Sequence, residues 1–176
     1  MNESDFNNGL LEFLAGSPTP FHAVKQLKQL LTASGFEQLE EHSSWSLKPG
    51  GRYFVVRNGS SIVAIRTGSV HPADEGLRLI GTHTDSPCLK IKPAPEIRRQ
   101  GFLQLGVEIY GGVLLSPWFD RDLSLAGKVT CRMENKEINS VLIDFRRPVA
   151  TVPSLAIHMN RDVHKNRTIN QQKEVV

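Results

Sequence analysis

The residues best placed to do chemistry lie in residues 77–87, where an apolar run ends in a glycine and His83 and Asp85 follow two positions apart. The pattern predicts a buried strand over residues 77–81 that delivers polar side chains at its end. Because side chains two apart share one face of a strand, His83 and Asp85 can meet around one point. They suit a metal, either both as ligands or with the carboxylate orienting the histidine ring. A single His-x-Asp also arises by chance, so the tripeptide alone leaves a structural role open.

A second polar cluster, Asp120 and Asp122 with Arg121 between them, follows two aromatic residues. Carboxylates at this spacing could bind a metal or form a general acid/base pair. They could equally form a salt-bridged turn. Arg121 repels a cation electrostatically, which favours the structural role.

Two further histidines are weaker candidates. His22 falls in the first turn of a predicted helix, where we expect an exposed or capping side chain. His158 ends an apolar run that predicts a short helix or strand.

Helical spacing in the first part of the chain predicts two amphipathic helices. The first spans residues 5–15, with Ser4 or Asp5 as N-cap and Gly16 as its end. The second begins at Pro20, with Thr19 as its cap, and ends near Gly35.

Strands dominate the rest of the sequence. Residues 53–57 and 61–66 flank an Asn-Gly pair that predicts a hairpin, and residues 103–110, 127–132 and 138–145 predict further strands. No helix is expected between residues 90 and 150. The chain therefore reads as an α/β fold with a β-rich module inserted after the His83 strand, and we place the boundary between residues 1–92 and 93–176.

Composition narrows the class of protein. With 176 residues, 39% hydrophobic residues and only two cysteines, the sequence is that of a globular protein from a reducing compartment, for which the cytoplasm is the default. No apolar run has the length of a membrane helix, and the N-terminus is too polar for a signal peptide. The formal charge is +3 without a basic stripe, so no nucleic-acid partner is expected.

Five phrases in order resemble the aspartyl aminopeptidase family of zinc exopeptidases. They are SPTPFH at 17–22, GTHTDSP at 81–87, GFLQ at 101–104, WFDRDL at 118–123 and LAIH at 155–158. The similarity runs from about residue 8 to residue 172. It implies an α/β/α catalytic domain interrupted by a β-rich dimerisation domain, two zinc ions, a homo-oligomer, and peptide substrates with an acidic N-terminal residue. In this family a metal-activated water attacks the peptide carbonyl and a glutamate acts as general base.

The resemblance assigns roles to three residues of this chain. His83 matches a zinc ligand, and Asp85 matches the carboxylate that orients that histidine. His158 matches a residue described either as a zinc ligand or as reaching a neighbouring subunit's active site to stabilise the reacting carbonyl. We favour the second role because His158 falls in the β-rich module.

The bridging aspartate, the paired glutamates and the last ligands of the family have no counterpart in this sequence, so the resemblance implies a truncated, N-terminal portion. His83 and Asp85 alone cannot hold two zinc ions. Two hypotheses follow: the polypeptide belongs to a zinc aminopeptidase, or the isolated chain is a noncatalytic assembly module. In both cases uncovered strand edges predict poor solubility of the isolated chain.

Overall fold

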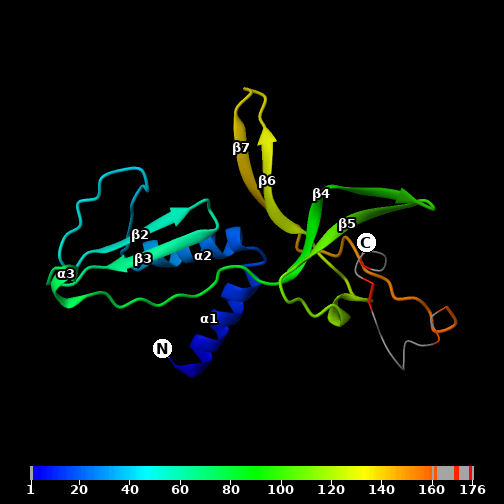
Figure 1. Ribbon diagram of the computed structural model, residues 1–176, viewed down its shortest axis with the longest axis horizontal. Helices are drawn as coiled ribbons and strands as arrows, with labels where there is room; N and C mark the ends of the chain where they lie inside the picture. The colour runs from blue at the N-terminus through cyan, green and yellow to red at the C-terminus, as the bar shows by residue number, and fades with distance from the viewer. Residues whose placement is uncertain (1, 160, 162–168, 171–174, 176) are drawn as a thin grey trace. The chain divides into compact units, whose positions relative to one another are not determined.

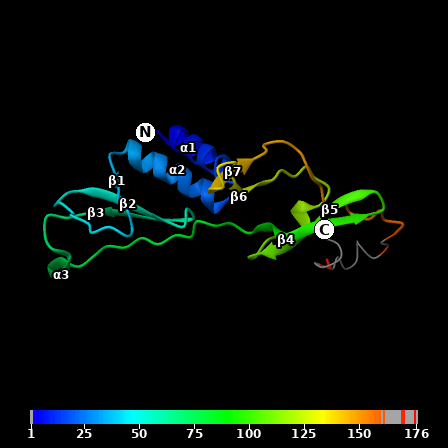
Figure 2. The ribbon, with the colours of Figure 1, turned by 90° about the horizontal axis from the view of Figure 1, so that it is seen from above.

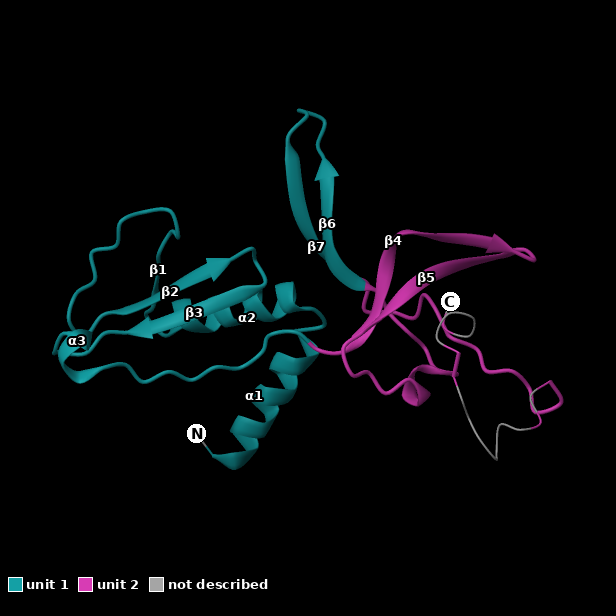
Figure 3. Cartoon of the chain, in the orientation of Figure 1, with its two compact units in different colours: residues 1–85, 126–144 teal, residues 86–125, 145–176 magenta. Residues whose placement is uncertain are grey.

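The computed structural model describes residues 2–159, 161, 169–170 and 175 (Figure 1). These residues form two compact units. Unit 1 comprises residues 1–85 and 126–144, and unit 2 comprises residues 86–125 and 145–176 (Figure 3). None of the helices in the described ranges is both long enough and apolar enough to cross a bilayer. The domain assignment of 1–92 and 93–176 stays a prediction.

Helix α1, Glu3–Ala15, confirms the first predicted helix, and Gly16 is its C-cap. The predicted N-cap was wrong. Asn2 is the cap: its side chain accepts a hydrogen bond from Asp5 N at 2.8 Å, and the Asp5 carboxylate accepts one from Asn2 N at 3.3 Å. This reciprocal pair satisfies two amides that the first turn leaves without helical partners, so the helix starts earlier than the apolar spacing suggested.

Helix α2, Pro20–Ala33, begins as predicted, with Thr19 as N-cap and Pro20 at its first position. Its first turn buries His22, Ala23 and Val24. The helix lies along one face of a small sheet (Figures 1 and 2).

That sheet contains β1, Glu37–Gln38, parallel to β2, Arg52–Arg57, which pairs antiparallel with β3, Ser61–Arg66. Asn58 and Gly59 connect β2 to β3 with φ of 55° and 68°, the left-handed values a tight hairpin turn requires. The predicted hairpin is confirmed. The buried residues of β2 are Tyr53, Phe54 and Val55, and Phe54 is only 1% exposed.

The predicted strand at residues 77–81 was wrong. A short helix, α3, Pro72–Glu75, is followed by residues 77–87 without regular structure, and Leu77, Leu79 and Ile80 are 75%, 88% and 96% exposed. A strand forms only where neighbouring backbone satisfies its amides and carbonyls. Within the described part of the chain, no strand pairs with this segment.

Unit 1 also contains β6, Ala126–Arg132, and β7, Ile138–Asp144, paired antiparallel around the turn predicted at residues 134–136. The Lys128 ammonium lies 4.3 Å from the centre of the Phe21 ring, a cation–π contact with the first turn of α2.

Unit 2 is built on a long ribbon of β4, Cys88–Arg99, and β5, Phe102–Tyr110. The register shifts between Ile91 and Glu96, where two prolines interrupt the ladder, so β4 is bulged rather than ended there. The expected absence of helices from residues 90 to 150 is confirmed apart from one 3-10 turn, η1, Ser116–Trp118.

Candidate functional site

The structure brings His83 and Asp85 together, although the strand expected to carry them is absent. His83 Nδ1 lies 2.6 Å from the main-chain oxygen of Asp85 and 3.7 Å from its carboxylate Oδ1. The closest partner of the ring is therefore the backbone carbonyl, and the carboxylate is a more distant second. Both groups belong to an irregular segment of unit 1.

The hydrogen bond fixes which ring nitrogen of a neutral His83 carries the proton. A carbonyl oxygen can only accept, so Nδ1–H donates to Asp85 and Nε2 is left with its lone pair. The His83 side chain is 81% exposed, which makes that lone pair accessible. This is the arrangement found in zinc-ligating histidines, where a bond at one nitrogen orients the ring and raises the basicity of the other.

One oriented imidazole does not make a zinc site. Structural zinc takes four protein ligands and catalytic zinc takes three with a water. In the ranges that the structure describes, no three His, Cys, Asp or Glu side chains are grouped so that they could hold a metal ion. His83 fits the part of a single zinc ligand, and these residues by themselves do not complete a site.

His158 belongs to unit 2 and is exposed. The predicted short helix or strand before it was wrong: residues 153–156 have no regular structure and His158 lies in a turn closed by a hydrogen bond from Met159 N to Ala156 O. Among the residues that the structure describes, the apolar run is paired at Val152, in an isolated parallel bridge with Phe119.

The cluster of Asp120, Arg121 and Asp122 has a structural role. Its spacing alone was also compatible with metal binding or with a general acid/base pair. The Asp120 carboxylate accepts a hydrogen bond from Ser154 N at 2.8 Å, and Asp120 N donates to Val152 O at 2.9 Å. Arg121 Nη1 donates to Pro117 O at 3.3 Å rather than to a carboxylate. The cluster thus ties residues 150–154, the segment that leads to His158, to the turn after η1.

The spacing of the two carboxylates did not predict this anchoring function of Asp120. The backbone of Asp120 has a φ of 55°, a left-handed conformation that Asp and Asn tolerate better than most residues. An Asp after two aromatic residues and before Arg gave no sign of a partner 34 positions away.

Of the two alternatives expected for His22, an exposed or a capping side chain, the structure excludes exposure and supports a part in the helix cap. The residue is 8% exposed, and its Nδ1 lies 2.8 Å from the hydroxyl of Thr19. The same hydroxyl caps the helix by accepting from His22 N at 3.4 Å. His22 thus takes part in the cap as the partner of the capping residue, and its ring is buried.

Residues 13–176 match the model of a protein family described as "Aminopeptidase I zinc metalloprotease (M18)". A relative from Pseudomonas entomophila named "Probable M18 family aminopeptidase 2" is 59% identical over 169 residues, which are 96% of this chain and 39% of the relative. The protein of the same name from Pseudomonas savastanoi pv. phaseolicola is 57% identical over 172 residues, or 98% of this chain and 40% of the relative. The chain therefore spans about two fifths of the length of these relatives.

Solved structures with a similar fold support the family match. Ape4, in a cryo-EM structure of the Ape4 and Nbr1 complex, is 40% identical with a TM-score of 0.85, covering 93% of this chain and 32% of that one. The mApe1 dodecamer of Saccharomyces cerevisiae is 32% identical with a TM-score of 0.80, covering 90% of this chain and 37% of that one. The helices and sheets described above follow the fold of the matching part of these aminopeptidases.

Proposed function

Since the chain belongs to the Aminopeptidase I zinc metalloprotease (M18) family, we propose that the protein it comes from is a zinc-dependent aminopeptidase that releases N-terminal residues, preferably acidic ones, from peptides. The observation that carries this proposal is the family match over residues 13–176. The geometry of His83 supports it, because the family's chemistry needs an imidazole nitrogen that is accessible and unprotonated.

In the proposed zinc site, His83 and Asp85 have different roles. His83 is a zinc ligand through Nε2, and Asp85 holds the ring through its carbonyl, with its carboxylate nearby. When bound, zinc supplies a Lewis acid that activates water. The other ligands and the general base are expected from the part of the relatives' length that this chain does not match.

For His158 we propose a role in a neighbouring copy, where its imidazole stabilises the reacting carbonyl of the substrate. Its exposure and its place in unit 2 support this over zinc ligation. This role requires a homo-oligomer, which the dodecameric state of mApe1 supports. We also propose an α/β/α catalytic domain interrupted by a β-rich dimerisation domain, and a cytoplasmic location.

The first experiment measures zinc content and the hydrolysis of aspartyl, glutamyl and leucyl chromogenic substrates, with the 176-residue chain and with a protein of the relatives' full length that carries it. We expect zinc and turnover only in the longer protein. His83→Ala should lower turnover and the affinity for zinc by at least about 100-fold, because even residues that only orient a ligand change zinc affinity about 10–100-fold.

His42→Ala is the matched control, since His42 is an exposed histidine of the same unit. It should leave zinc content and turnover unchanged. Equal rates on leucyl and aspartyl substrates would remove the acidic preference from the proposal. A longer protein without zinc or turnover would refute the peptidase assignment and favour the noncatalytic assembly module. The absence of a group of three possible metal ligands among the described residues is also consistent with such a module.

A further inference from the structure

A groove that none of the roles above uses lies beside β1 and the loop after it. It has a volume of about 380 Å³, and β1, the loop from Leu39 to Lys48 and Tyr53 of β2 line it. Hydrogen bonds hold the loop in place: Trp45 Nε1 donates to Glu40 O at 2.9 Å, and Lys48 N donates to the Tyr53 hydroxyl at 3.0 Å. The groove is therefore a formed feature of unit 1.

Its lining suits a cation. Glu37 and Glu40 contribute two exposed carboxylates, and the indole of Trp45, which is 42% exposed, offers an aromatic face. Lys48 is the single cationic residue of the lining. A guanidinium is the cation that best matches this set, because it pairs with carboxylates through fixed N–H groups and stacks on aromatic rings.

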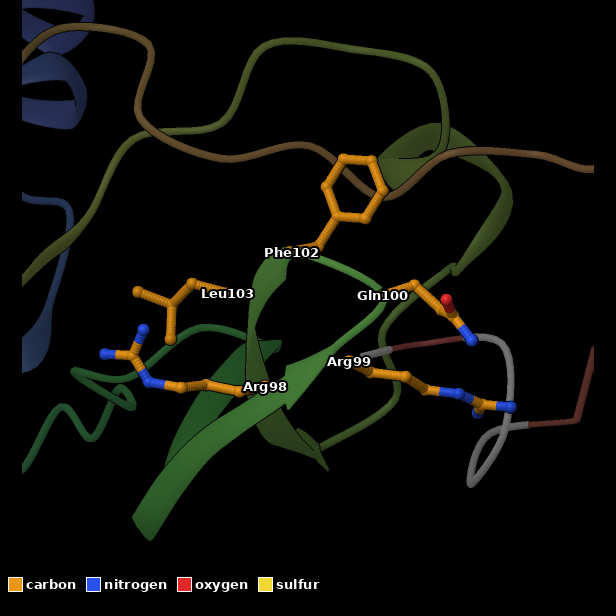
Figure 4. A pocket seen from close by; sticks show the side chains of 6 residues that line it. Arg98, Arg99, Gln100, Phe102 and Leu103 are labelled. Atoms are coloured by element: carbon orange, nitrogen blue, oxygen red, sulfur yellow. The ribbon is translucent and has the colours of Figure 1, made fainter.

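The tip of the β4–β5 ribbon carries the complementary groups. Gln100 and Gly101 form its turn, with φ of 51° and 82°, and Arg98, Arg99, Phe102 and Leu103 flank them around an open cavity of about 270 Å³. Figure 4 shows Arg98 and Leu103 pointing to one side of the ribbon and Arg99 and Gln100 to the other. Phe102 is 72% exposed and Leu103 is 58% exposed.

Arg98 and Arg99 differ from the two lysines of this ribbon, which already contact a carboxylate or an aromatic ring within it. Lys92 Nζ lies 3.4 Å from the Glu108 carboxylate, and Lys90 Nζ lies 5.6 Å from the centre of the Tyr110 ring. Neither Arg98 nor Arg99 has an ion pair among the residues that the structure describes. Arginine beside an exposed aromatic residue is the composition that protein interfaces favour.

We propose that the ribbon tip of one copy docks into the acidic groove of a second copy, with Arg98 and Arg99 paired to Glu37 and Glu40 and with Phe102 against Trp45. The second copy is the partner because the chain itself carries both complementary surfaces. Tip and groove are different patches, so the contact is heterologous and each copy can give one tip and accept another. The proposal rests on the homo-oligomer proposed above and specifies the surfaces that build it.

The test is a disulfide between two differently tagged chains. One carries Gln100→Cys at the tip and the other carries Ser43→Cys in the groove, both with Cys131→Ser because Cys131 is exposed. The control partner carries Lys28→Cys on the exposed side of α2. After mild oxidation, mass spectrometry of the peptides identifies the bonded cysteines, so only the specified contact between two chains is scored.

We expect the bond to Ser43→Cys to form at least about tenfold more than the bond to Lys28→Cys, because Ser43 lines the groove that the tip enters and Lys28 does not. R98E/R99E should lower the yield to that of the control, and combining it with E37R/E40R on the groove chain should restore it. K25E/K28E changes net charge equally on exposed residues away from both surfaces and should have no effect.

Equal yields with both partners, or a yield that charge reversal at the tip does not change, would overturn the proposed contact. Peptide hydrolysis is measured separately on the longer protein. A contact without hydrolysis would refute only the peptidase proposal, and hydrolysis without the contact would refute only the docking.

Discussion

Asp120 should control how firmly the segment that leads to His158 is held. Its carboxylate accepts the bond from Ser154 N at 2.8 Å, and its backbone adopts φ of 55°. Because Asp120 is exposed, the lost hydrogen bond is worth only about 1 kcal/mol. Placing alanine in a left-handed conformation costs about 1 kcal/mol more. Asp120→Ala should therefore loosen this attachment by about 2 kcal/mol.

Amide hydrogen exchange at Leu123 measures this effect. Leu123 N donates to Ala150 O at 2.9 Å, a bond that the substitution does not touch but that depends on the same segment remaining attached. A loss of 2 kcal/mol corresponds to about a thirtyfold loss of protection. Leu39 N, which donates to Phe54 O in unit 1, is the control amide and should keep its protection.

A matched series separates the two contributions. Asp120→Asn keeps an acceptor oxygen and the tolerance for the left-handed backbone, so it should lose less than about 1 kcal/mol. Asp120→Gly keeps only the backbone tolerance and should fall between Asn and Ala. Unchanged protection at Leu123 in Asp120→Ala, or an equal loss in the Asn and Ala variants, would refute the reasoning.

Three further predictions concern unit 1. Thr19→Ala should destabilise the unit in urea denaturation by at least about 1 kcal/mol more than Thr19→Ser, because alanine removes both the cap of α2 and the hydroxyl 2.8 Å from the His22 ring; equal losses would contradict this. Gly51→Ala should cost about 1–3 kcal/mol in the same assay, because the added Cβ would overlap the Tyr53 ring, and an unaffected midpoint would show that the ring moves freely. For neutral His83, imidazole ¹⁵N shifts should show a protonated Nδ1 and an unprotonated Nε2. The opposite tautomer would show that Nδ1 does not donate to the Asp85 carbonyl, and this bond would no longer support His83 as a zinc ligand.

The elements that sequence analysis predicted correctly are those whose causes are local. Thr19 and Pro20 start α2 because a cap and a fixed φ act within one turn. Asn58 and Gly59 form the β2–β3 turn because both adopt positive φ. Burial of His22 was missed because the spacing of apolar residues does not say which way the first turn of a helix faces.

The strand predicted at residues 77–81 shows where local reasoning fails. An apolar run followed by Gly81 is a sound strand signal, but the strand also needs a neighbour to pair with its backbone, and no sequence pattern within the run specifies one. The apolar side chains of the run are exposed for the same reason. The run therefore leaves an exposed apolar surface on this chain, which is the physical basis for expecting poor solubility of the isolated chain.

In the candidate site, too, features set by local contacts are predictable from the sequence, and features set by long-range contacts are not. The orientation of His83 depends on a carbonyl two residues away, so the tripeptide carries enough information to prepare one imidazole. The segment before His158 is held at Ser154 by Asp120, a contact across 34 positions, and within the described ranges no further His, Cys, Asp or Glu side chains are grouped so that they could hold a metal ion. A metal site with several ligands is therefore less predictable than any one of its ligands, because each further ligand adds a long-range contact. The anchor at Asp120 is a long-range contact of this kind, and hydrogen exchange at Leu123 measures its strength.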